Sequence, residues 1–186
     1  MKYHNRTMPR LAMWSVLCCA MVLMVGMLVC PNVALAETTD TAGNTYSEDD
    51  VASAQGLQLN NDLFWGGSTF DLTKSQVDGD TFLAGQKVTI NGSSVLGSCF
   101  TAGQTINVKD AAFGGSIRAA GETISMSNTY VTNNVTAAGQ TITSDTTPST
   151  PGFTAAGQAI DLYGTLAAAA LSAQAVVLHG IVNGHS

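Results

Sequence analysis

Cysteine and basic residues are scarce in this sequence, and each shortage excludes a class of protein. Three of the four cysteines, Cys18, Cys19 and Cys30, lie near the N-terminus, so only Cys99 remains for a folded part. A single cysteine excludes an intramolecular disulfide framework. Lysine and arginine number seven against thirteen aspartates and glutamates. This acidic balance argues against nucleic acid and anionic membrane surfaces as partners, because both would repel it.

The one long hydrophobic run stands at the N-terminus. Basic residues precede an almost unbroken apolar stretch, 11–30, and small residues ending at Ala36 follow it. This pattern is typical of a secretory signal, so we predict a signal peptide over 1–36 that is cleaved after Ala36. The alternatives are an uncleaved membrane anchor, since the run approaches spanning length, and a lipoprotein site at Cys30. Each of them places the rest of the chain outside the cytoplasm.

A polar stretch follows the predicted signal. Residues 37–56 are acidic and show no hydrophobic period, so we predict a disordered acidic leader there. The folded part is then 57–186, which is long enough to bury a core of its own.

Glycine recurs in that folded part at every eighteenth position. The column consists of Gly67, Gly85, Gly103, Gly121, Gly139 and Gly157. Apolar residues stand two and four positions before each glycine and three and five positions after it, with few exceptions. Short runs with a period of two indicate strands. Three such strands in each repeat indicate a triangular coil whose corners are turned by glycine, asparagine or serine.

Stacking explains why the chain repeats a phrase that forms neither a good helix nor a good strand alone. One coil cannot bury its apolar face, whereas coils stacked about 4.8 Å apart can. The sequence therefore predicts an all-β, single-stranded triangular β-helix (a β-solenoid), right-handed, with about 18 residues per coil and six to seven coils. Helical repeats are excluded by the missing helical period, and a left-handed hexapeptide helix is disfavoured because the three sides differ.

Two irregularities are visible near the C-terminus. Residues 144–152 contain two prolines, which cannot donate to a strand ladder, so we expect a loop there. The glycine phrase then returns two positions early, with Ala173 in place of glycine.

The repeats resemble the bactofilin, or polymer-forming cytoskeletal, family. The matching segments are 77–90, 95–108 and 113–126, with weaker copies at 131–144 and 151–162. The resemblance implies a right-handed β-helix that joins end to end into filaments without nucleotides and scaffolds other envelope proteins. The well-known members work in the cytoplasm, so the signal segment implies an exported, envelope-associated bacterial relative.

Candidate chemistry is sparse. Asp78 and Asp80, with Asp62 one coil earlier, form a column that would bind a cation or act in polysaccharide cleavage. The simpler interpretation is a solvated corner of an acidic protein, because Ser98 and Ser116 occupy the next coils. Neither these serines nor Ser94 has a histidine or carboxylate partner at a readable spacing.

Three further features have both a chemical and a structural interpretation. His179 and His185 would form a metal pair only with a third ligand, which the sequence does not supply. Cys99 falls at an inward position, which favours a small buried hydrophobe over a reactive thiol. Glutamine and threonine recur in outward rows, and we interpret these rows as ladders of hydrogen-bonded side chains. The alternative hypothesis is that the flat threonine-rich face binds glycan.

We therefore expect no catalytic residue, no metal and no cofactor, and we predict a non-enzymatic, exported structural or scaffold protein of the bacterial envelope. The expected partners are copies of itself and, beyond these, cell-wall glycan or envelope proteins, with a membrane contact only if the N-terminal segment stays uncleaved. Val176, Leu178 and Val182 form the expected self-association end. The alternative is an extracellular glycan-binding or polysaccharide-degrading β-helix protein.

Overall fold

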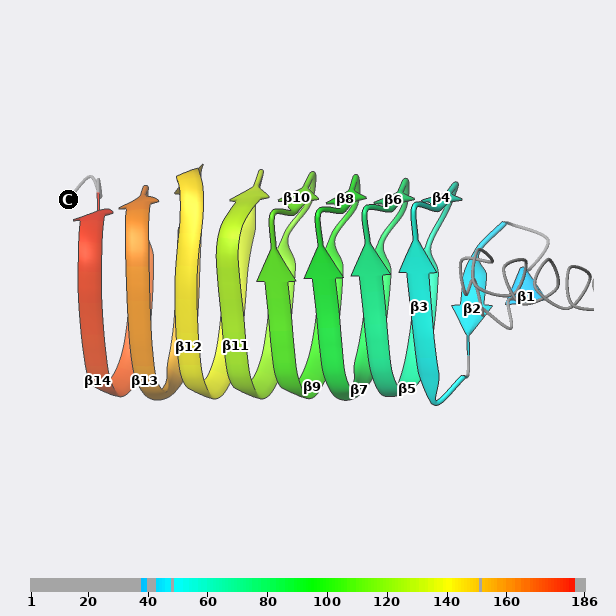
Figure 1. The fold of residues 1–186 in the computed structure, drawn as a ribbon. Coiled ribbons are helices and arrows are strands. Elements are labelled where there is room, and N and C mark those ends of the chain that lie inside the picture. The colour runs from blue at the N-terminus through cyan, green and yellow to red at the C-terminus, as the bar shows by residue number, and fades with distance from the viewer. Residues whose placement is uncertain (1–37, 40–42, 48, 151, 183–186) are drawn as a thin grey trace, which may run out of the picture. The chain divides into compact units, whose positions relative to one another are not determined.

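The computed structural model describes residues 38–39, 43–47, 49–150 and 152–182, and the predicted signal over 1–36 lies outside them. All regular elements of the described part are strands, and they stack in chain order as parallel coils (Figure 1). Partners in neighbouring coils keep the period of the sequence through most of the ladder, so that Gly67 pairs with Gly85. The predicted β-solenoid is therefore confirmed.

The strands have the following bounds: β1 Thr38–Thr39, β2 Thr45–Ser47, β3 Val51–Gln55, β4 Gln58–Leu59, β5 Leu63–Thr73, β6 Gln76–Val77, β7 Thr81–Asn91, β8 Ser94–Val95, β9 Cys99–Lys109, β10 Ala112–Phe113, β11 Ile117–Val131, β12 Asn134–Thr150, β13 Gly152–Leu166 and β14 Ala169–Val182.

Each regular coil contains one long strand that turns a corner at its glycine and one short strand. In β5, Leu63 and Trp65 point inward before Gly67, and Phe70 and Leu72 point inward after it. The alternation shifts by one residue across the glycine, because the strand turns from one side of the coil to the next. The short strand β6 supplies the third side.

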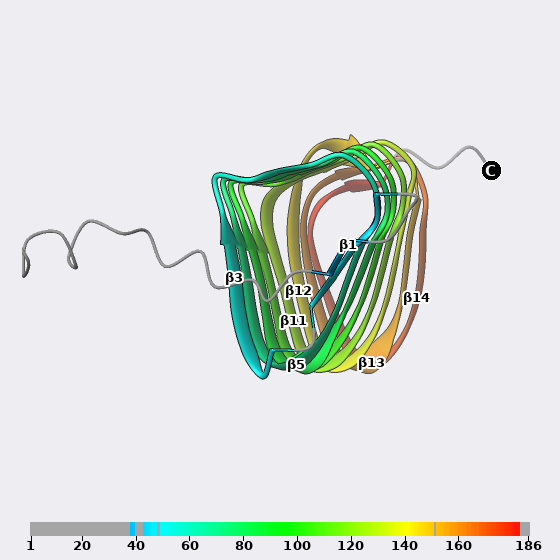
Figure 2. The same cartoon turned by 90° about the vertical axis from the view of Figure 1, so that its right-hand side faces the viewer.

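Two ladders connect the coils, and the ladder of the long strands continues to β14. The long strands pair in the order β5-β7-β9-β11-β12-β13-β14, and the short strands in the order β4-β6-β8-β10-β11. In Figure 2 the chain rises along the side that carries β3, crosses the top and descends opposite while it recedes from the viewer. The coils therefore wind with a right hand.

The core consists of columns of inward side chains, one above another. The fully buried large side chains are Phe70, Phe113, Phe153, Leu63, Leu72, Ile90, Ile106, Ile117, Ile124, Met126, Ile142 and Ile160. All of them stand at positions that the period of the sequence marks as inward. Neighbouring copies in such a column pack against each other at the spacing of strands in a sheet.

The glycine column is needed for close approach of the backbone. A Cβ placed on Gly121 would lie well inside 3.0 Å of the Gly103 carbonyl oxygen, and Gly139 stands in the same relation to Gly121. Along the whole glycine column the nearest clashing atom is a backbone carbonyl oxygen of the preceding coil. The corresponding position in the first coil is Asp49, whose carbonyl oxygen lies where a Cβ on Gly67 would fall.

A second corner adopts the left-handed backbone conformation in five successive coils. The residues with positive φ there are Gly56, Lys74, Gly92, Asp110 and Asn128. Glycine, asparagine and aspartate tolerate this conformation, and Lys74 is the exception. Ser75, next to Lys74, stabilises the corner by donating from its Oγ to the Ala54 carbonyl oxygen at 3.0 Å.

The predicted disordered leader over 37–56 is wrong for the described residues from 43 onward. β2 and β3 both pair in parallel with β5, so these residues form a first coil. Its inward positions hold small side chains such as Ala52 and Ala54, and Asp49 occupies the glycine position. The coil therefore lacks the apolar and glycine signals of the others.

The loop predicted over 144–152 is also wrong. β12 continues to Thr150, and the irregularity takes the form of a register shift between Thr146 and Thr150. Ser144 remains at its inward position and is buried. Farther on, Gly157 pairs with Ala173, so the shortened repeat keeps its register.

Candidate functional site

The acidic corner predicted as a candidate cation site serves the backbone instead. The Oδ1 atom of Asp62 accepts a hydrogen bond from the Asp80 amide at 2.7 Å, and Oδ1 of Asp80 accepts one from the Ser98 amide at 2.6 Å. The Ser98 hydroxyl oxygen then accepts the Ser116 amide at 3.2 Å. Each side chain thus caps one amide of the next coil. On the surface, Oδ1 of Asp78 accepts a hydrogen bond from the side-chain amide nitrogen Nε2 of Gln76 at 2.7 Å.

These contacts bear on the chemistry of the corner. A carboxylate that accepts a backbone N–H is oriented along the stack, which makes the column a structural ladder. Within the described part of the chain, no three histidine, cysteine or acidic side chains are placed to hold a metal ion. Ser94 lies apart from this ladder, in β8.

Cys99 lies in the core, as predicted. Its side chain is completely buried, and this burial raises the pKa of its thiol to about 11. Interaction with the Thr81 side chain has the smaller, opposite effect of lowering that pKa. The thiol is therefore protonated at neutral pH, and both its charge state and its burial make it unreactive.

His179 has a local partner in the neighbouring coil. Its Nε2 atom lies 3.3 Å from Oδ1 of Asp161, and its ring stacks on Tyr163 with a centroid separation of 4.4 Å. The Tyr163 hydroxyl donates to the same carboxylate at 3.2 Å. Desolvation and the negative charge of Asp161 raise the pKa of Tyr163. His185, the other half of the predicted pair, lies outside the described residues.

The C-terminal strand exposes apolar side chains. Among the described strands β14 pairs only with β13. Val176 and Leu178 stand in register with Ile160 and Leu162, whose side chains are buried, yet they are 42% and 47% exposed. Val182 is 41% exposed. Inward-column side chains are thus uncovered on the side of β14 that faces away from β13.

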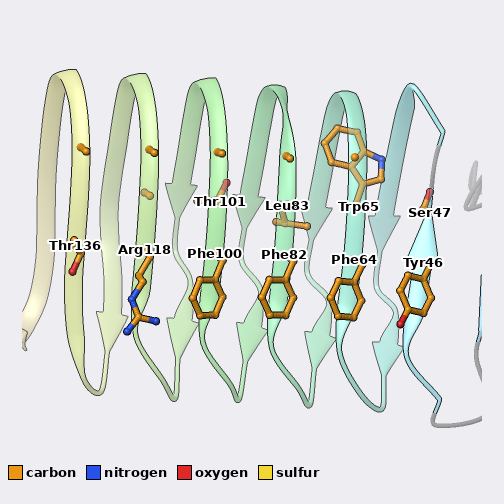
Figure 3. Close-up of a pocket in the computed structure, with 16 residues that line it drawn as sticks. Tyr46, Ser47, Phe64, Trp65, Phe82, Leu83, Phe100, Thr101, Arg118 and Thr136 are labelled. Carbon is orange, nitrogen blue, oxygen red and sulfur yellow. The ribbon is translucent and has the colours of Figure 1, made fainter.

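A row of aromatic side chains on the outer surface was missed by the sequence analysis. Tyr46, Phe64, Phe82 and Phe100 stack in register with centroid separations of 4.7–4.8 Å and nearly parallel rings (Figure 3). The guanidinium of Arg118 continues the row and lies 5.1 Å from the Phe100 ring centroid. The signal was available, because the three phenylalanines recur at the same interval as the glycines.

This row borders a shallow groove of about 790 Å³. The floor of the groove is a second outward-facing row, made of very small residues: Gly66, Ala84, Ala102, Ala120 and Ala138. The lining contains no acidic residue, and Arg118 is its one basic residue. An apolar strip with a single cation is therefore set into the surface of an acidic protein. We call it the aromatic groove.

Comparison of the chain with protein-family models, with curated proteins and with solved structures finds no match. Within the described residues there is also no helix of the length and apolar character needed to cross a membrane.

Proposed function

We propose that this protein is a non-enzymatic, exported structural protein of the bacterial envelope, similar to bactofilins, which associates with itself end to end. The observation that carries the proposal is the uncovered apolar side of β14. Val176 and Leu178 continue core columns that are buried in every preceding coil. A second molecule placed there would cover them and pair the free edge of the strand.

The contacts of the candidate reactive groups also favour a structural role. The carboxylates of Asp62 and Asp80 hold backbone amides, the thiol of Cys99 is buried, and His179 is paired with Asp161. Asp62, Asp80 and Cys99 thus have packing or hydrogen-bonding tasks within the coil stack, and His179 has an ion-pair partner on its surface. Export rests on the signal-like segment over 1–36 and is part of the proposal.

The geometry of the joint determines the size of the assembly. A contact between two β14 edges uses the same surface on both molecules, so the assembly is complete as a dimer. A filament also needs a joint at the first coil, where β3 pairs with β5. A dimer therefore indicates a β14–β14 contact, and longer particles indicate that both ends are used.

Analytical ultracentrifugation combined with electron microscopy tests the proposal. The paired substitution Val176→Lys and Leu178→Lys places two charges on the apolar edge, and we expect it to abolish association. The matched control, Gln140→Lys with Gln158→Lys, adds the same charge at exposed outward positions and should leave association unchanged. A parent chain that stays monomeric at all concentrations would contradict the proposal.

Glycan binding or degradation through Asp78 and Asp80 is the second candidate from the sequence. No contact of either carboxylate favours it, because Asp80 accepts the Ser98 amide and Asp78 accepts from Gln76. We therefore retain the structural role as the proposed function.

A further inference from the structure

We propose that the aromatic groove binds a single-chain anionic amphiphile of the fatty-acid type. The hydrocarbon chain would lie along the row of rings, and the anionic head would meet Arg118. This inference is independent of end-to-end association, because the groove lies along the side of the stack and β14 does not line it.

The lining selects an apolar ligand. The ring row from Tyr46 to Phe100 stands beside the floor of one glycine and four alanines, so the surface is apolar along the whole length. Two lining residues with hydroxyl groups, Ser47 and Thr101, are buried under this surface. Burying a sugar would cost the hydration of its hydroxyls without replacing it, since few polar groups face the groove.

An extended peptide is also disfavoured. The backbone groups of β5, β7 and β9 are engaged in parallel ladders with their neighbours on both sides. The groove therefore offers no row of free N–H and C=O groups, which a peptide needs in order to add as a strand. A hydrocarbon chain makes no such demand.

Arg118 determines the charge of the head group. It is the only arginine of the described residues, and none of the described carboxylates pairs with it. Its guanidinium is held against the Phe100 ring and keeps donors available for a carboxylate or phosphate. The lining has no acidic residue that would repel such a head. Thr136 lies next along the row, where its hydroxyl would donate to the same head (Figure 3).

The length of the row indicates the length of the chain. Its three successive centroid separations of 4.8, 4.7 and 4.8 Å follow the spacing of stacked strands, which places the Tyr46 and Phe100 rings about 14 Å apart. An extended dodecyl chain has similar length. One end of that chain would lie at Tyr46 and the other at the guanidinium.

Quenching of tryptophan fluorescence tests this assignment. Trp65 lines the groove, and Trp14 is the only other tryptophan, so the full chain with Trp14→Phe reports on Trp65 alone. Brominated dodecanoate should quench its emission in a saturable manner, below the concentration at which the probe forms micelles. Brominated dodecanol has the same tail and a neutral head, and we expect it to bind more weakly.

Two variants separate the head from the tail. Arg118→Gln should weaken dodecanoate binding about tenfold and leave dodecanol within twofold, because only the ion pair is lost. Phe82→Thr should weaken both probes, and threonine is tolerated in this column at Thr136. Lys87→Gln removes an equal charge at an exposed position outside the lining and is the control.

Three results would overturn the proposal. One is equal loss of both probes in Arg118→Gln, which would remove the head-group assignment. Another is unchanged quenching in Phe82→Thr when circular dichroism shows an intact fold. The third is quenching only by micelles or by phospholipid vesicles that contain a brominated lipid, which would indicate a membrane surface instead of a free amphiphile.

Discussion

Replacing Gly121 by alanine should damage the solenoid far more than one methyl group usually does. The added Cβ would lie well inside 3.0 Å of the Gly103 carbonyl oxygen and 3.3 Å from Cδ1 of Ile106. The first contact is backbone in the middle of a ladder, so it is relieved only by moving two coils apart. Overpacking of this kind costs about 3 kcal/mol. For a domain of this size the midpoint of thermal unfolding should fall by roughly 10 °C.

Gly66→Ala is the matched control for this change. A Cβ on Gly66 meets nothing within 4 Å, and the next coils carry Ala84 and Ala102 at the same position. This variant should be neutral or more stable by about 0.5 kcal/mol, because alanine loses less backbone entropy on folding. Circular dichroism melting of both variants decides the matter. If Gly121→Ala melts within about 2 °C of Gly66→Ala, close backbone approach does not explain the glycine column.

Two other expectations follow from the corner and the core. Asp80→Ala leaves the Ser98 amide without its acceptor and should lower the free energy of unfolding in urea by about 1–3 kcal/mol, whereas Asp78→Ala should change it by less than about 0.5 kcal/mol. Equal effects would contradict the structural ladder. Cys99, with a thiol pKa of about 11 and complete burial, should resist alkylation at pH about 8 in the native protein and react fully in denaturant. Mass spectrometry of its peptide measures this, and rapid native labelling would refute it.

The regular coils were predictable because period and burial agree in them. Inward positions such as Val88 and Ile106 repeat with the period of the glycine column and are buried, and the corners use glycine, serine, asparagine and aspartate. The extension of β12 through Pro148 to Thr150 was not predictable from the local sequence. The ladder of neighbouring coils constrains that segment, and this constraint outweighs the local signals for a loop.

The candidate site was less predictable, because outward columns carry no burial signal. The phenylalanines at 64, 82 and 100 and the arginine at 118 were visible as a repeat, but the stacking of Tyr46 on this row depends on a first coil that the period did not reveal. The aspartate column, in contrast, suggested a binding site that the structure does not form. An acidic column looks like a ligand set in the sequence, and only the structure shows that Asp62 and Asp80 accept hydrogen bonds from backbone amides.

The first coil provides a test that separates the two accounts of residues 37–56. If these residues were a disordered leader, a chain starting at Leu57 would be as stable as one starting at Glu37. The structure predicts otherwise, because β2 and β3 cover Leu63, Trp65, Phe70 and Leu72 of the next coil. If these four side chains became about as exposed as Val176 and Leu178 are at the other end, each would lose about half of its burial energy.

The expected loss is then on the order of 4 kcal/mol, since burying one such side chain contributes about 2 kcal/mol. The Trp65 indole would also lose its hydrogen bond to the Asp49 carbonyl oxygen, 3.0 Å long in the intact coil, so its fluorescence should shift to longer wavelength. A chain starting at Gly43 retains β2 and β3 and serves as the control. Denaturation curves and tryptophan emission that are identical for chains starting at Glu37, Gly43 and Leu57 would show that the first coil contributes nothing to the stack.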